Sequence, residues 1–235
     1  MIPAVTAEQM REVDRVATQE LRIELIQMME NAGRSLTDLA ISSFRPKSVT
    51  VLAGTGGNGG GGLVAARHFA NRGVISRVVL SRAEAELAEV PAHQLEILRR
   101  MGVEVHFRPP AADLVIDALI GYSLRGDPHR RSAELIAWAN QQQSPLLALD
   151  LPTGLDATTG QPATPCIRAA ATLTLGLPKA GLLKAPGLTG RLYLADISIP
   201  PAVYRRLGIP APLVFERDTL LELIWSNPNR PSVGH

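Results

Sequence analysis

Long apolar runs alternate with segments of helical periodicity through much of the chain. The runs are rich in β-branched and aliphatic residues, which is typical of strands buried on both faces of a parallel sheet. They cover residues 48–53, 76–80, 103–107, 113–121 and 145–150. Helix-forming segments cover residues 63–70, 91–101 and 132–142. This order predicts an α/β fold, a three-layer α/β/α Rossmann-like arrangement with a mostly parallel central sheet.

The two ends of the chain add further elements. Thr6 and Gln9 have the spacing of a capping box, so a helix is expected to begin there, and a second helix is expected over residues 24–43. Toward the other end, residues 170–175 and 191–197 predict two more strands, joined by a loop rich in Pro and Gly. We expect a short helix over residues 200–207. The whole chain, residues 1–235, is predicted to be a single domain whose tail is loosely ordered from about residue 226.

Asn31 and Gly33 interrupt the second predicted helix with residues that are poor helix formers. Small residues in a helix let another helix approach closely, and a ligand contact would also favour them. We favour the first interpretation, in which Ala32 and Gly33 form a contact between helices.

Composition narrows the classes of function. The chain has 235 residues, of which 46% are hydrophobic and 20% charged, and its net charge is +2. Few aromatic residues and no long basic run argue against a nucleic-acid partner. The single cysteine, Cys166, excludes an internal disulfide and favours a reducing compartment. We see no leader segment and no apolar stretch long enough for a bilayer, so no membrane association and a cytoplasmic location are expected.

Glycine dominates residues 54–62, between the first predicted strand and its helix. A glycine-rich turn in this position lets backbone N–H groups approach an anion, so it predicts a phosphate-binding loop. The G-x-G-x-x-G spacing is satisfied, but Leu63 stands where a P-loop would continue with Lys or Ser/Thr. A tight turn without any ligand is the alternative. Asn58 is the one side chain of this loop that is well suited to coordination.

Polar side chains also mark two other predicted strand ends. Asp117 ends one strand, and Asp150 ends the next, shortly before Thr153. In a parallel sheet these ends meet at one edge, so Asn58, Asp117 and Thr153 are expected to present hard oxygen donors suited to a cation. Asp150 would remain for proton transfer. Either aspartate alone could instead cap a turn.

Three further charged residues are expected outside this chemistry. Asp127 and Asp156 have the surroundings of turn residues. Lys179 follows a proline at a strand end and could face either the same crevice or solvent, and we expect it to face solvent.

Several separated motifs resemble those of the NAD(P)H-hydrate epimerase family. Residues 7–14 and 29–34 resemble its amino-terminal helices, and residues 54–68 resemble its G-x-G-N-N-G-G-D-G-L-V-A-A-R-H loop. Residues 117–121, 150–156 and 178–181 resemble its D-A-[LI]-[FI]-G, D-[IL]-P-[ST]-G and P-K-x-G segments. The resemblance runs from about residue 6 to about residue 200, and it implies a stand-alone epimerase domain.

The resemblance implies a reaction and a set of site residues. The family repairs hydrated NADH and NADPH by interconverting their R and S epimers. Asp150 would be catalytic, and Asn58, Asp117 and Thr153 would hold a potassium ion. The substrate site would comprise Gly57, Asn58, Gly59, Gly60, Gly61, Gly121, Tyr122, Ser123, Leu124, Arg125, Gly126, Asp127 and Asp150. A separate NAD(P)H-hydrate dehydratase would be the functional partner, and a homodimer is a candidate assembly.

Two positions depart from the family loop. Gly57 replaces the first Asn, and Gly61 replaces an Asp. The loss of that acid favours an alternative function, a catalytically weakened nucleotide-binding or scaffold member of the family. An ordinary dehydrogenase is a weaker alternative, because the second strand runs into Ser81 and Arg82 and not into a ribose-binding acid.

Overall fold

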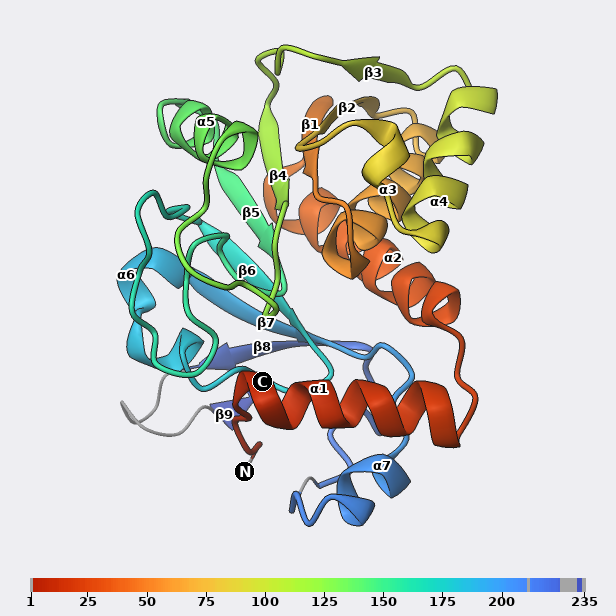
Figure 1. Cartoon of the computed structure of the whole chain (residues 1–235), viewed down its shortest axis with the longest axis vertical. Coiled ribbons are helices and arrows are strands. Elements are labelled where there is room, and N and C mark those ends of the chain that lie inside the picture. Colours follow the sequence, from red (N-terminus) through yellow and green to blue (C-terminus); the bar gives the residue numbers. More distant parts are fainter. Residues whose placement is uncertain (1, 211, 225–231, 234–235) are drawn as a thin grey trace.

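One twisted sheet organises the molecule in the computed structural model, which describes residues 2–210, 212–224 and 232–233 (Figure 1). Within these residues nine strands follow the order β3-β2-β1-β4-β5-β6-β7-β8-β9. Neighbouring strands are parallel from β3 to β7, and β8 and β9 are antiparallel additions. The strands are β1 (Ser48–Ala53), β2 (Ile75–Leu80), β3 (Glu104–His106), β4 (Leu114–Ala118), β5 (Leu146–Leu149), β6 (Ala171–Leu175), β7 (Arg191–Ala195), β8 (Leu220–Ile224) and β9 (Ser232–Val233).

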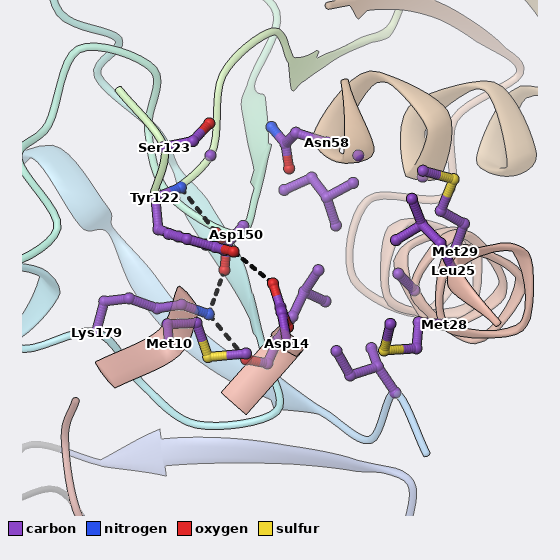
Figure 2. A pocket seen from close by; sticks show the side chains of 17 residues that line it. Met10, Asp14, Leu25, Met28, Met29, Asn58, Tyr122, Ser123, Asp150 and Lys179 are labelled. Carbon is purple, nitrogen blue, oxygen red and sulfur yellow. Dashed lines mark hydrogen bonds and ion pairs between the residues drawn. The ribbon is translucent and has the colours of Figure 1, made fainter. Parts of the chain in front are cut away.

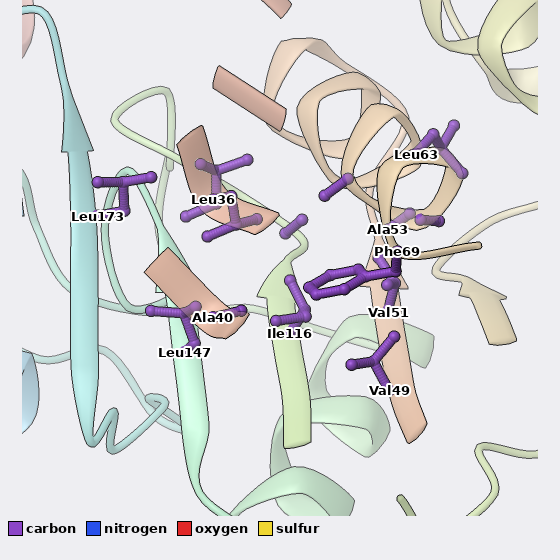
Figure 3. Close-up of a cluster of buried hydrophobic side chains, with 14 of the residues drawn as sticks. Leu36, Ala40, Val49, Val51, Ala53, Leu63, Phe69, Ile116, Leu147 and Leu173 are labelled. Atoms are coloured by element: carbon purple, nitrogen blue, oxygen red, sulfur yellow. The ribbon is translucent and has the colours of Figure 1, made fainter. Parts of the chain in front are cut away.

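Helices cover both faces of this sheet. They are α1 (Ala7–Arg15), α2 (Leu25–Phe44), α3 (Gly57–Asn71), α4 (Glu89–Arg100), α5 (Arg131–Asn140), α6 (Pro186–Thr189) and α7 (Pro201–Arg206). Side chains of α2, α3 and α4 form a core with one face of the strands, as Leu36, Phe69 and Ile116 illustrate (Figure 3). The next residue of β4, Val115, points to the opposite face and packs with α5. The predicted three-layer α/β/α fold is confirmed.

The glycine run differs from its prediction, because α3 begins at Gly57 and not near Leu63. Several of these helical positions hold glycine because their neighbours leave no room for a side chain. A Cβ on Gly62 would lie 2.4 Å from the Cβ of Ala118 on β4, and one on Gly60 would lie 2.4 Å from Met29 Sδ on α2. Part of the glycine content therefore serves close packing of α3 against the sheet and α2.

Gly33 of α2 lies at the same close contact between α2 and α3. A Cβ at this position would lie 2.5 Å from the Cβ of Val64 on α3. The predicted helix–helix contact through small residues is confirmed.

The carboxyl-terminal region differs in its details from the sequence-based expectation. Strand β8 was not predicted, and the loop between β6 and β7 contains a 3₁₀ turn (Leu182–Lys184) and α6. The tail predicted to be loose from about residue 226 lies outside the described residues, except for β9. None of the helices in the described ranges has the length and apolar character that crossing a bilayer requires.

Candidate functional site

A cavity of about 340 Å³ opens at the carboxyl edge of the sheet, where β1, β4, β5 and β6 end. The chain leaves β1 toward β2 on one side, and β4 lies on the other side of β1, so the strand order reverses here. Open α/β sheets bind their ligands at such a switch point. Helices α1 and α2 border the cavity with methionine side chains (Figure 2). The polar side chains that line it are Asp14, Asn58, Tyr122, Ser123, Asp150 and Lys179.

A buried ion pair forms the charged centre of this cavity. Lys179 Nζ donates to Asp150 Oδ1 at 2.5 Å, and the two side chains are 0% and 6% exposed. Lys179 also donates to the carbonyl oxygen of Leu175 at 2.8 Å. The expectation that Lys179 faces solvent is wrong. A buried ammonium needs a buried counter-charge, and the end of β5 supplies one.

The backbone of Asp150 is in the left-handed region, with φ of +68°. Aspartate is one of the few residues other than glycine that tolerates this conformation. Its amide N–H still donates to the carbonyl oxygen of Leu173 on β6 at 2.7 Å. The chain therefore turns sharply as β5 ends, while the carboxylate remains in the cavity.

Tyr122 connects Asp150 to a second carboxylate. Its backbone N–H donates to Asp150 Oδ2 at 3.1 Å, and its hydroxyl donates to Asp14 Oδ2 on α1 (Figure 2). Burial raises the pKa of Asp14 above its ordinary value, although the Tyr122 hydrogen bond and the charge of Lys179 oppose this shift. Burial and the neighbouring carboxylates hold the pKa of Tyr122 above its usual range.

Sequence reasoning assigned Asp14 no role, although a signal was present. Asp14 follows Met10 by four residues and precedes Ala17 by three, and both of these are buried. A carboxylate on the apolar stripe of a helix has to find a polar partner or a cavity.

Asp117 of β4 and Thr153, four residues past the end of β5, contact each other. Asp117 is fully buried and accepts hydrogen bonds from both the backbone N–H and the hydroxyl of Thr153, each at 2.7 Å. It also accepts a hydrogen bond from the backbone N–H of Leu119 at 3.2 Å, so it stabilises the turn that follows β4 as well. Burial raises the pKa of Asp117 to about 6, against the effect of these hydrogen bonds.

Among the described residues, Asn58 is the one with two buried side-chain atoms that lack a hydrogen-bond partner. Its amide oxygen and nitrogen are both buried, and neither forms a hydrogen bond within the described residues. The oxygen lies 3.3 Å from the position that a Cβ on Gly121 would occupy. Buried amides are nearly always satisfied, so this orphaned group indicates a site for a ligand.

The remaining predicted site residues divide into two groups. Gly57, Gly61, Gly121, Tyr122 and Ser123 line the cavity with Asn58 and Asp150. Gly59 and Gly60 are buried where Gly54 and Met29 approach α3. Leu124, Arg125, Gly126 and Asp127 lie outside the cavity lining, and Asp127 accepts a hydrogen bond from the backbone of Thr164 at 3.0 Å. The loop after Gly121 thus reaches the cavity only with its first residues.

Comparison with known proteins decides the family. A family model described as "YjeF-related protein N-terminus" matches residues 25–181. The chain belongs to this family. This membership confirms the resemblance predicted from the separated motifs.

Several named proteins are similar to this chain over most of its length. An NAD(P)H-hydrate epimerase from Dehalogenimonas lykanthroporepellens is 50% identical over 88% of this chain and 87% of its own length. One from Rhodopirellula baltica is 32% identical over 88% and 89%. A bifunctional NAD(P)H-hydrate repair enzyme from Moorella thermoacetica is 36% identical, over 98% of this chain but 46% of its own length. The crystal structure of the yeast protein ynu0 has the same fold, with a TM-score of 0.81 at 24% identity over 94% and 100% of the two chains.

Proposed function

We propose that this chain interconverts the R and S epimers of hydrated NADH and NADPH. The observation that carries this proposal is the buried Asp150–Lys179 pair in a cavity at the switch point of the sheet. Relatives that cover most of this chain bear the name NAD(P)H-hydrate epimerase. A carboxylate in such a cavity is suited to a reaction that passes through a cation.

The substrate chemistry explains what a carboxylate does in this reaction. A hydrated nicotinamide ring carries a hydroxyl on a carbon next to the ring nitrogen. When this hydroxyl receives a proton, the nitrogen lone pair expels it as water and leaves an iminium cation. Water that adds to the other face of the cation gives the opposite epimer. Asp150 stabilises the cation and takes part in proton transfer at the reacting oxygen, as the proposed catalytic residue.

Substrate phosphates are proposed to bind at the start of α3. Gly56 and Gly57 are exposed there, and the first N–H groups of a helix attract anions. The residues from Gly121 to Asp127 would complete the binding surface, with Gly121, Tyr122 and Ser123 against the ring.

Potassium is the proposed cofactor, and the donor set fits it. Asn58 offers an unpartnered amide oxygen, Asp117 a buried carboxylate and Thr153 a hydroxyl. These hard oxygen ligands suit an alkali cation, and no cluster suited to a transition metal occurs among the described residues. A bound potassium ion would supply positive charge that balances Asp117 and attracts the anionic substrate.

A partner and a location complete the proposal. The bifunctional relative carries a second repair activity on one chain, so we propose a functional partnership with an NAD(P)H-hydrate dehydratase. A cytoplasmic location and a homodimer stay predictions.

The decisive experiment follows the conversion of one purified epimer into the other. The R epimer is incubated with protein in potassium buffer, and the S epimer is separated by chromatography at several times. The spontaneous reaction is subtracted, and a parallel series replaces potassium with sodium. Conversion above background supports the proposal. Nucleotide binding without conversion would support the alternative that Gly61 favours, a weakened binding or scaffold protein.

A further inference from the structure

Two carboxylates enter the cavity from different elements, Asp150 from the end of β5 and Asp14 from α1. We propose that Asp14 is a second catalytic residue, which exchanges a proton with the hydroxyl on the ring face that Asp150 does not serve. This inference rests on the epimerase function proposed above.

Inversion needs proton transfer on both faces of one ring carbon. The hydroxyl leaves from one face, and water adds to the other. Asp150 is held in place on both oxygens, since Oδ1 accepts from Lys179 and Oδ2 from the N–H of Tyr122. A carboxylate fixed in this way cannot follow the reacting oxygen from one face to the other. A second group is therefore required, unless the substrate leaves and rebinds.

Asp14 has the properties that this second group needs. Only its Oδ2 accepts a hydrogen bond, from the Tyr122 hydroxyl, and no partner of Oδ1 occurs in the described part of the chain. Burial raises the pKa of Asp14 and so favours its protonated form. Asp150, in contrast, accepts a hydrogen bond from the Lys179 ammonium and one from the N–H of Tyr122. A protonated carboxyl and an ion-paired carboxylate that line the same cavity can act as an acid–base pair.

The proposed steps balance in atoms and electrons. The Asp14 carboxyl donates its proton to the hydroxyl oxygen, the C–O bond breaks, and the nitrogen lone pair forms the C=N bond. The departing group is water. A water molecule on the other face then forms a C–O bond, the π electrons return to nitrogen, and Asp150 accepts the released proton. Exchange with solvent restores the starting protonation, and the reverse reaction uses the same groups in opposite roles.

The charged surroundings of Asp14 define what a pH profile should show. The pKa of Asp14 depends on three groups in the cavity, Tyr122, Lys179 and Asp150. Arg11 lies near Tyr122, and Tyr204 lies near Asp14. The active enzyme needs one proton on the Asp14–Asp150 pair, so the profile of kcat/KM should be bell-shaped. Its alkaline limb reports loss of the proton that Asp14 holds.

The test compares Asp14→Asn with Glu12→Gln, a change of an exposed acid on the same helix. The Asn variant should lose about 10²–10⁴-fold in background-corrected turnover and lose the alkaline limb. Glu12→Gln should keep both the turnover and the alkaline limb of the parent protein. Tyr122→Phe removes a hydrogen bond that lowers the pKa of Asp14, so its alkaline limb should move to higher pH. Circular dichroism and thermal unfolding verify that each variant is folded.

The outcomes separate this inference from the function on which it rests. Turnover of Asp14→Asn within about threefold of the parent, with the alkaline limb retained, would refute the role of Asp14 and leave the epimerase function standing. A parent protein without activity above background would refute the proposed function, and the role of Asp14 with it. A large loss in Asp14→Asn with an unchanged pH profile would also count against proton transfer, since a structural role predicts that result.

Discussion

Removal of the Lys179 ammonium is the sharpest test of the charged centre of the cavity. Lys179→Met keeps the length of the side chain but leaves Asp150 without its counter-ion 2.5 Å away, in a site where both side chains are almost fully buried. Breaking a buried pair by removal of one partner costs about 3–5 kcal/mol of unfolding free energy. In a chain of 235 residues this loss corresponds to a fall in Tm of about 6–20 °C.

A double-mutant cycle then separates the cost of the orphaned charge from lost packing. Asp150→Asn is the suitable second change, because Asn tolerates the φ of +68° that this position requires. The double variant leaves no unpaired charge, so it should recover at least about 2 kcal/mol relative to Lys179→Met. Urea and thermal unfolding measure these differences. Lys47→Met changes an exposed lysine and should stay within about 0.5 kcal/mol of the parent. A cost below about 1 kcal/mol for Lys179→Met, or strict additivity in the double variant, would refute the buried-pair argument.

Three further predictions concern single residues. Asp150→Asn should lower background-corrected epimerisation by about 10²–10⁴-fold while nucleotide binding, measured by calorimetry, persists. Gly61→Asp should lower the free energy of unfolding by about 1 kcal/mol, because its Cβ would lie 2.8 Å from the terminal Cδ2 of Leu149, which has to shift; a gain in kcat would show that Gly61 is an eroded substrate contact. Cys166 should react with iodoacetamide at pH 8 about 10³-fold more slowly in the folded protein than in urea, because burial raises the pKa of its thiol from 9.0 to about 12. Equal rates in the two states would show that the thiol is not buried.

Most of the fold was accessible to sequence reasoning because its signals are local. The continuous apolar runs of β1, β4 and β5 mark strands buried on both faces, and their order along the chain indicates a parallel sheet. The start of α3 was not accessible, because glycine has a low helix propensity and the close packing against Ala118 and Met29 that calls for glycine is a tertiary feature. Tertiary packing overrides the low helix propensity of glycine at these positions.

Some residues of the candidate site could be predicted from the sequence, and others could not. The meeting of Asp117 with Thr153 follows from the rule that parallel strands end at one edge, and the structure joins them by a 2.7 Å hydrogen bond. Lys179 and Asp14 lie far from these strand ends in sequence, on a loop and on the first helix. Their positions depend on how α1 and the segment after β6 pack over the cavity, which no local pattern specifies.

Three energetically costly features of different kinds meet at this one cavity. Asp150 has a left-handed backbone, Lys179 is a fully buried ammonium, and the Asn58 amide is buried without a partner. Each feature costs free energy that a purely structural role would avoid, since an apolar core of similar volume would be at least as stable. Such local conflicts are expected where a fold holds reactive groups ready for a ligand. The glycines at residues 59–62 of α3 obey the packing rules, because a Cβ at each of these positions would lie within 3.0 Å of a neighbouring atom. The strain at Asp150, Lys179 and Asn58, and not the glycine run, is therefore the stronger indication of catalysis.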